Sequence, residues 1–359
     1  MVKNTFDVAL VVGTRPNFIK AAPLIKYFES KNLDVLFIHT GQHWDKNLSH
    51  NIFNDLEMRE PDVNLETPLD GMNSQLSFMI KSIDHTLSKN IVSRVGVFGD
   101  VTSTLAAALV AKNREIEVFH VEAGLRSKNM MMPEERNRLA VDALSDYLFT
   151  PSEDAVDNLL AENISSEKIF NVGNIMIDTL KVNLEKIIDS KKTITKQLQI
   201  EQPYFVMTLH RPANLTNEVL NGIFKALDSF KKDYKIVIPA HPRLSQYIEA
   251  NNLEFENFVF IEPLPYINFL ALVSGADLVL TDSGGLQEET TFLNIKCLTL
   301  REETERPITV TNGTNKVIGT NTEVIINEIN SSLDSKLPNE IKIKYWDGNT
   351  SQRIYETLY

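Results

Sequence analysis

Carboxylates and guanidinium groups gather in VEAGLRSKNMMMPEERNR, residues 121–138. Glu122 ends one short apolar run, Asp100 follows another, and Glu134 follows a proline that can begin a helix. Carboxylates brought from separate strand ends can take and return protons on two faces of a substrate, provided that their environments separate their pKa values. We therefore predict an acid/base set of Asp100, Glu122 and the first-turn glutamates Glu134 and Glu135.

A simpler interpretation of the glutamates stays open. Carboxylates are favoured in the first turn of a helix, and Arg136 and Arg138 are close enough in sequence to pair with Glu134 and Glu135. Methionines 130–132 are expected to pack in the loop or to form a mobile lid, rather than to bind a cofactor.

Two glycine-containing segments resemble anion sites. GTRPNFIK places Arg15 and Lys20 beside the free N–H groups of a helix that can begin near Pro16. TDSGGLQEE offers a small turn and a second helix N-terminus for a diphosphate, with two glutamates that can accept ribose hydroxyls. TERP adds a cation after the next strand. The residues concerned are Ser283, Gly284, Gly285, Glu288, Glu289 and Arg306. Taken singly, each has a simpler explanation as a solvated turn, a tight loop or a surface cation.

Histidines concentrate at predicted strand ends, which favours a catalytic use of some of them. Five of the seven lie there: His39, His43, His120, His210 and His241. No GxGxxG follows a strand, no GxxxxGK[ST] is present, and HVEAG is not the HExxH zinc motif. We expect no metal and no cofactor, so that side chains perform the chemistry.

Valine- and isoleucine-rich runs alternate with helical patterns along the chain, which is typical of parallel sheets covered by helices. One series runs from DVALVV to IFNVG; a second, from YFVMTL to IKCLTL, follows a lysine-rich stretch near 184–202. The pattern predicts an α/β protein with two Rossmann-like, doubly wound halves. Ligands of such sheets bind at the carboxyl ends of the strands, where the candidate residues fall.

Composition excludes several classes of protein. With 43% hydrophobic and 23% charged residues, the chain is ordinary in composition and long enough for two cores. A net charge of −12 argues against nucleic-acid and anionic-membrane surfaces. Because no apolar run reaches about 18 residues and the single cysteine excludes an intrachain disulfide, we expect a cytoplasmic protein.

Ten motifs in order resemble those of the non-hydrolysing UDP-N-acetylglucosamine 2-epimerases: GTRPNFIKAAPLI, TGQHWD, GDVTST, HVEAGLRS, MPEERNR, VGN, TLHR, AHPR, TDSGGLQEE and TERP. The resemblance spans nearly the whole chain. It implies a GT-B-like fold with the substrate in an interdomain cleft, built from a domain at 1–173 and a UDP-binding domain at 174–345, with a helix at 346–359 packing back on the first. It also implies a homodimer.

The family's reaction is the interconversion of UDP-GlcNAc and UDP-ManNAc, by elimination of UDP to a 2-acetamidoglucal and re-addition, for surface-polysaccharide precursors. Carried over by motif, Asp100, Glu122 and Glu134 resemble the acid/base residues, and His210 the residue that meets the diphosphate. The resemblance assigns UDP-sugar binding to Arg15, Lys20, Phe269, Ser283, Gly284, Gly285, Glu289 and Arg306.

A second, activating UDP-sugar binds in many bacterial members, and the matching positions here are Gln42, Arg211 and His241. Trp44 and Asp45 depart from those members, which carry an arginine after the histidine, and Asn17 replaces a glutamate of many members. These departures weaken the prediction of an allosteric site.

Four alternatives remain at the level of sequence. The chain could epimerise a related UDP-2-acetamido sugar at C2, or hydrolyse the substrate to free N-acetylmannosamine and UDP. A GT-B glycosyltransferase would use the same UDP residues but would leave the acid cluster without a task. A non-catalytic UDP-sugar sensor could dispense with Glu122 and Glu134, which this chain retains.

Overall fold

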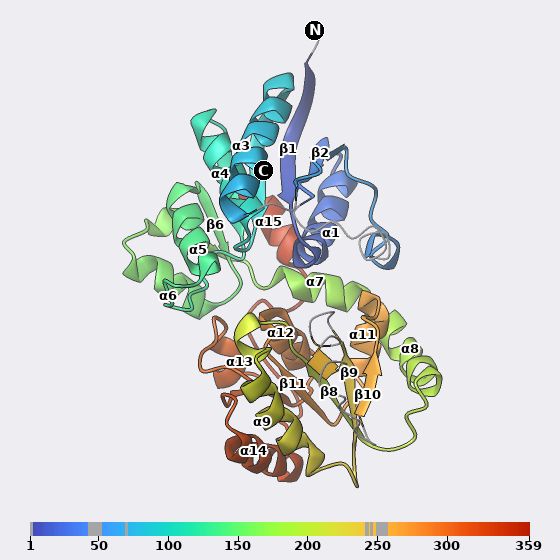
Figure 1. Ribbon diagram of the computed structural model, residues 1–359. Coiled ribbons are helices and arrows are strands. Elements are labelled where there is room, and N and C mark those ends of the chain that lie inside the picture. The colour runs from blue at the N-terminus through green and yellow to red at the C-terminus, as the bar shows by residue number, and fades with distance from the viewer. Residues whose placement is uncertain (1–2, 42–51, 69–70, 241–243, 245–246, 249–257) are drawn as a thin grey trace. The chain divides into compact units, whose positions relative to one another are not determined.

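A computed structural model describes residues 3–41, 52–68, 71–240, 244, 247–248 and 258–359 (Figure 1). The chain divides into unit 1, Met1–Val182 with Lys344–Tyr359, and unit 2, Asn183–Ile343. The first break thus follows residue 182 rather than 173, because helix α7 (Ile175–Val182) packs on α1 (Arg15–Ser30) within unit 1.

Unit 1 is a seven-stranded parallel sheet in the order β3-β2-β1-β4-β5-β6-β7. Its strands are β1 (Asn4–Val12), β2 (Val35–His39), β3 (Val63–Asn64), β4 (Asn90–Phe98), β5 (Glu117–Val121), β6 (Tyr147–Thr150) and β7 (Ile169–Asn171). Besides α1 and α7, its helices are α3 (Met72–Lys89), α4 (Thr102–Asn113), α5 (Pro133–Leu144), α6 (Glu153–Ala161), the short η1 (Ser166–Lys168) and α15 (Thr350–Leu358). The strand order reverses between β1 and β4, which is the usual ligand position in a doubly wound sheet.

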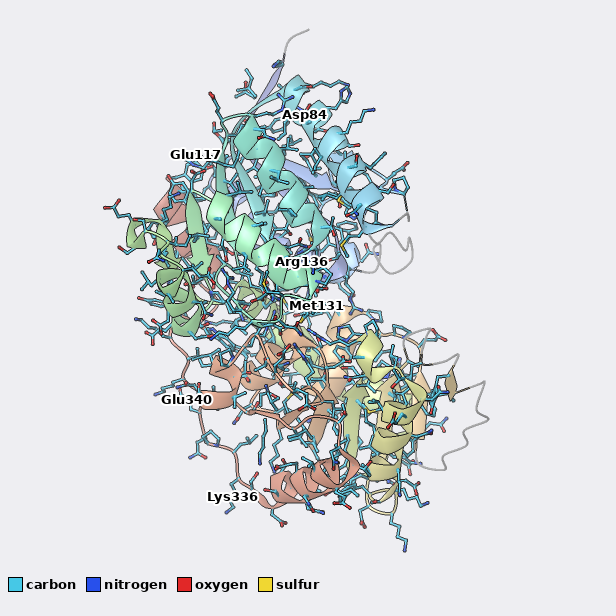
Figure 2. All side chains as sticks on the ribbon, turned by 60° about the vertical axis from the view of Figure 1, so that its left-hand side comes forward. Asp84, Glu117, Met131, Arg136, Lys336 and Glu340 are labelled. Atoms are coloured by element: carbon cyan, nitrogen blue, oxygen red, sulfur yellow. The ribbon has the colours of Figure 1, made fainter. Side chains whose placement is uncertain are left out.

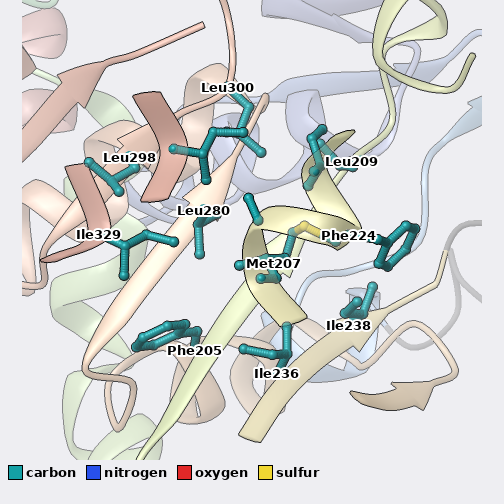
Figure 3. Close-up of a cluster of buried hydrophobic side chains, with 14 of the residues drawn as sticks. Phe205, Met207, Leu209, Phe224, Ile236, Ile238, Leu280, Leu298, Leu300 and Ile329 are labelled. Carbon is teal, nitrogen blue, oxygen red and sulfur yellow. The ribbon is translucent and has the colours of Figure 1, made fainter. Parts of the chain in front are cut away.

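Unit 2 repeats this plan with six parallel strands in the order β10-β9-β8-β11-β12-β13. They are β8 (Tyr204–Thr208), β9 (Lys235–Pro239), β10 (Phe258–Ile261), β11 (Leu278–Thr281), β12 (Cys297–Thr299) and β13 (Asn315–Val317). The helices are α8 (Leu184–Gln197), η2 (Pro212–Asn214), α9 (Asn217–Asp228), α11 (Tyr266–Val273), α12 (Gly284–Phe292), α13 (Ile308–Thr311) and α14 (Thr322–Asp334). Figure 3 shows the apolar core, in which Met207 and Leu280 from neighbouring strands face Phe224 and Ile329 from α9 and α14.

The α/β prediction with two doubly wound halves is confirmed, and each apolar run named in the sequence is a strand. Strands β3 and β13 were not predicted from the sequence, because they have only two and three residues and form no apolar run. The lysine-rich stretch near 184–202 is largely helix α8, which buries Ile187 and Ile194 and packs on α11.

Helix α15 is tied to unit 1 by a buried carboxylate. Asp178 accepts hydrogen bonds from the backbone N–H of Thr350 at 3.1 Å and of Ser351 at 2.7 Å, and from the Ser351 hydroxyl at 2.9 Å. These N–H groups lie in the first turn of α15, where a helix has no internal partners for them. Trp346, just before the helix, donates from Nε1 to the carbonyl of Pro151 at 2.9 Å.

Within the described part of the chain, no helix combines the length and apolarity that a membrane crossing requires. The same residues contain no group of three or more histidine, cysteine or acidic side chains that could hold a metal ion.

Candidate active site

In unit 1, the candidate residues lie at the carboxyl ends of three adjacent strands. Gly13 follows β1, Asp100 follows β4, and Glu122 follows β5. Lys20, from the second turn of α1, places Nζ against Oε2 of Glu122, and both side chains are nearly buried, with exposed fractions of 9% and 6%. Lys20, which is predicted to bind a phosphate, thus also contacts the candidate acid/base residue.

Gly99 leaves the space for this ion pair. A Cβ at Gly99 would lie 3.1 Å from Nζ of Lys20 and 3.4 Å from Oε2 of Glu122, and its φ of +61° suits glycine. Glu122 itself has a φ of +71°, which is strained for a non-glycine residue. Such strain concentrates at functional sites, because the surrounding structure must enforce it.

Asn17 fixes the start of α1 beside the same strands. Its Oδ1 accepts from the backbone N–H and the hydroxyl of Thr14, at 3.2 and 3.0 Å, and its Nδ2 donates to the carbonyl of Phe98 at 3.1 Å. A glutamate at this position could accept the same bonds but could not donate to Phe98. The departure from the family pattern is therefore accommodated by a bond between α1 and the end of β4.

Asp100 is held by Arg138 of α5. Nη2 of Arg138 contacts Oδ2 of Asp100, and Nη1 lies 3.1 Å from Oε2 of Glu135. Glu135 is buried and also accepts from the N–H groups of Ser127 and Lys128, both at 2.8 Å. Glu135 is thus fully engaged in shaping the loop, as the simpler interpretation of the glutamates requires for this residue.

Glu134 differs from its neighbour. It is half-buried, and the structure records for it no hydrogen bond or ion pair to any described residue. Arg136 turns away from it and donates to the carbonyls of Met130 and Met131, at 2.9 and 3.4 Å. Figure 2 shows Met131 and Arg136 together at one end of unit 1, and Met131 is 85% exposed.

Two histidines of the strand-end group are structural, which corrects the argument from histidine placement. His39 is fully buried, and burial lowers its pKa to about 4. His120 places Nδ1 at 2.6 Å from Asp142 and Nε2 at 2.7 Å from the carbonyl of Gly99. His43 and His241 lie outside the described residues, so only His210 remains as a described, accessible candidate.

Asp142 anchors the framework beneath Glu122. It accepts from Nη2 of Arg126 at 2.7 Å and from the N–H of Gly124 at 3.2 Å, in addition to His120. Burial raises the pKa of Asp142, but the His120 and Arg126 charges and hydrogen bonds outweigh it and lower the pKa overall. The carboxylate is therefore ionised and holds the turn that carries Glu122.

In unit 2, His210 and Asp282 follow β8 and β11, the two strands between which the order reverses. Nδ1 of His210 lies 2.6 Å from Oδ1 of Asp282, whose side chain is fully buried while that of His210 is 52% exposed. Asp282 also accepts from the N–H of Arg211 at 3.0 Å and from Nδ2 of Asn214 at 3.1 Å.

Arg306 lies directly at the N-terminus of α12. A Cβ at Gly284 would come within 2.4 Å of Nη1 of Arg306, so any other residue there would displace this guanidinium. Nε of Arg306 is 3.1 Å from Oε1 of Glu288, and Nη1 is 3.6 Å from Oε2 of Glu305. The first N–H groups of α12, at Ser283 to Gly285, and one arginine thus meet at one place, as an anion site requires.

The remaining unit 2 candidates lie on α12, on α11 and after β8. Glu289 is buried and accepts from the Tyr266 hydroxyl at 3.0 Å, and Phe269 is half-buried one turn further along α11. Arg211 lies 3.3 Å from Oε1 of Glu305. In unit 1, Arg15 is the half-buried first residue of α1. Gln42 and His241 of the predicted allosteric set lie outside the described residues.

Sequence reasoning overlooked two buried acids that hold the candidates, Asp142 and Asp282, whereas Glu135 was expected to pair with an arginine of its own helix and does so with Arg138. Asp282 stands in the quoted motif TDSGG directly after a strand, which was a usable signal. For Asp142 the only sequence signal was its position on α5, one turn after Arg138.

Comparisons with known proteins find the same family of relatives over nearly the whole chain. The family model described as UDP-N-acetylglucosamine 2-epimerase matches residues 26–359. The chain belongs to this family. A curated UDP-N-acetylglucosamine 2-epimerase of Methanocaldococcus jannaschii is 38% identical over 98% of both chains. The UDP-2,3-diacetamido-2,3-dideoxy-D-glucuronate 2-epimerase of Pseudomonas aeruginosa is 36% identical over 98% of this chain and 99% of that protein.

Solved structures of this epimerase family have the same fold. The crystal structure of the M. jannaschii UDP-GlcNAc 2-epimerase in complex with UDP-GlcNAc and UDP aligns with a TM-score of 0.90 at 38% identity, covering 98% of this chain and 99% of that one. The Neisseria meningitidis enzyme bound to UDP-GlcNAc aligns with a TM-score of 0.89 at 33% identity and the same coverage. This epimerase-family chain therefore has a GT-B-like pair of Rossmann-type units.

Proposed function

We propose that the protein is a non-hydrolysing UDP-N-acetylglucosamine 2-epimerase, which interconverts UDP-GlcNAc and UDP-ManNAc. The observation that supports this most directly is the set of carboxylates at adjacent strand ends of unit 1, in a chain of the epimerase family. A glycosyltransferase or a UDP-sugar sensor of the same fold would have no use for them.

The proposed reaction proceeds by elimination and re-addition. The C1–O bond breaks with its electron pair leaving on the UDP oxygen, while a carboxylate takes the proton from C2 and a C1–C2 double bond forms. UDP then adds back at C1 as a proton is delivered to the opposite face of C2. Two faces require two proton-transfer groups, so one carboxylate alone is insufficient.

The acid/base residues are proposed to be Asp100, Glu122 and Glu134. Glu122 contacts Lys20 and Asp100 contacts Arg138, whereas Glu134 has no charged partner among the described residues. Because the three carboxylates have different surroundings, one can act as the acid while another acts as the base.

The unit 2 residues are proposed to bind UDP. The N-terminus of α12 and Arg306 suit the diphosphate, Glu289 suits the ribose, and Phe269 suits the uracil. His210 is proposed to meet the charge that develops on the departing diphosphate. Arg15 and Lys20 are proposed to bind UDP from unit 1. Arg211, with Gln42 and His241, is proposed to bind a second UDP-sugar.

Incubation with UDP-GlcNAc in D₂O, followed by proton NMR, tests the proposal. We expect deuterium at C2 and both UDP-sugars at equilibrium. Release of free N-acetylmannosamine and UDP would instead identify a hydrolysing enzyme, and the absence of C2 exchange would refute this substrate.

A related substrate is the second candidate, because the P. aeruginosa 2-epimerase, which acts on a diacetamido uronate, is nearly as similar as the M. jannaschii enzyme. The same NMR assay with UDP-2,3-diacetamido-2,3-dideoxy-D-glucuronate, at equal concentration, decides between them by kcat/KM.

The protein is further proposed to be a cytoplasmic homodimer that supplies surface-polysaccharide precursors. Its one cysteine, buried at position 297, fits a reducing compartment. Light scattering of the purified protein would test the dimer.

A further inference from the structure

The contacts of Asp282 fix the orientation and the proton of the His210 ring. Asp282 is fully buried and lies 2.6 Å from Nδ1 of His210, while the backbone N–H of His210 is 3.2 Å from the same carboxylate. Both the main chain and the side chain of His210 are therefore held by one group. Half of the imidazole remains exposed, and its Nε2 has no hydrogen bond within the described residues.

The carboxylate of Asp282 can only accept hydrogen bonds. Burial raises the pKa of Asp282, but the bonds from His210 and Arg211 outweigh it, so the pKa is lowered and the group is ionised at neutral pH. An ionised carboxylate has no proton to give, so the short contact requires a proton on Nδ1 of His210.

We propose that Asp282 is a positioning residue of the epimerisation reaction: it accepts from Nδ1 of His210, turns Nε2 toward the substrate diphosphate and, as an anion, stabilises the doubly protonated ring, whose Nε2–H can donate to the leaving oxygen. This inference rests on the proposed function and on the role of His210 in it. Asp282 touches no reacting atom itself; it acts through the ring. The buried partner thereby decides which ring nitrogen meets the leaving group.

The neighbours of Asp282 make an asparagine there a sharp probe. Oδ2 of Asp282 accepts from the N–H of Arg211 at 3.0 Å and from Nδ2 of Asn214 at 3.1 Å. The backbone donor cannot turn away, so the single oxygen of an asparagine must take this position. Its NH₂ then faces Nδ1 of His210 and, as a donor, requires an unprotonated Nδ1, so the ring can carry a proton only on Nε2 and cannot become positively charged.

The D282N variant should therefore fold, bind UDP and lose turnover. We expect kcat to fall by about 10²-fold, in the range of a weakened donor to transition-state charge, because the ring loses its positive charge, with little change in KM. Long-range ¹H–¹⁵N NMR of the histidine rings should show His210 protonated at Nδ1 in the wild type and unprotonated at Nδ1 in D282N. In N214A, which removes a donor to the same carboxylate but leaves the His210 contact, that signal should stay as in the wild type.

A double-mutant cycle separates positioning from general damage. In an H210A background, D282N should change kcat by less than about twofold, because it acts only through the missing ring. A loss of similar size in both backgrounds, wild-type turnover of D282N, or an unchanged tautomer would each overturn the proposal. If instead the wild-type protein itself failed to epimerise, the proposed function would fall, and the NMR tautomer would still report on the His210–Asp282 pair.

Discussion

Replacement of Glu122 by glutamine should affect stability as well as turnover. The ammonium of Lys20 contacts this carboxylate, and their side chains are 9% and 6% exposed. Removing one partner of a buried pair leaves the other charge without compensation, at a loss of about 3–5 kcal/mol. With a denaturant slope of about 2 kcal/mol per molar urea, the unfolding midpoint of unit 1 should fall by about 2 M.

The charge-neutral double variant K20M/E122Q separates the two effects. It removes both buried charges, so the urea midpoint should return close to that of the wild type. Turnover in the D₂O assay should stay at least about 10²-fold below wild type in both E122Q and the double variant, because neither has the carboxylate.

Tryptophan fluorescence suits this measurement. Both tryptophans, at positions 44 and 346, fall in the residue ranges of unit 1, and Trp346 is buried. The matched control is E153Q, which breaks the exposed Lys344–Glu153 pair of the same unit and should leave the urea midpoint nearly unchanged. If the K20M/E122Q double variant lost as much stability as K20M and E122Q together, the buried ion pair would be refuted. Wild-type turnover of E122Q would refute the acid/base role.

Three further results are expected. G284A should weaken UDP binding by at least about tenfold in calorimetry, because its Cβ would meet the Arg306 guanidinium at 2.4 Å, whereas G71A, with open space at its Cβ, should bind as wild type. D178A should lower the free energy of unfolding of unit 1 by about 2 kcal/mol in urea titrations, since it removes the acceptor for the first turn of α15. Cys297, whose pKa burial raises to about 12, should not react with a thiol reagent at pH 8 in the native protein; rapid native labelling would contradict its burial.

The sheets were predictable from sequence because parallel strands, buried on both faces, appear as uninterrupted apolar runs. The same reasoning placed Glu122 and His210 at strand ends, since the residue after such a run must emerge at the carboxyl edge. It could not decide which polar side chain meets which. Lys20 and Glu122 are far apart in sequence, and no local pattern reports their contact.

The same limit explains the error over histidines. His39 and His120 end or nearly end strands as His210 does, yet they are enclosed by residues from other elements. Burial and partners depend on tertiary packing, so strand-end position alone cannot separate a structural imidazole from an accessible one.

The return of the chain to unit 1 has a consequence for biosynthesis. Helix α15, which Asp178 caps, is translated only after all of unit 2. While the ribosome is still making unit 2, the nascent unit 1 lacks this helix and leaves the surfaces of α1 and α7 that it covers open to water. Domains usually fold in the order of their synthesis, but here the unit that begins first must be completed last.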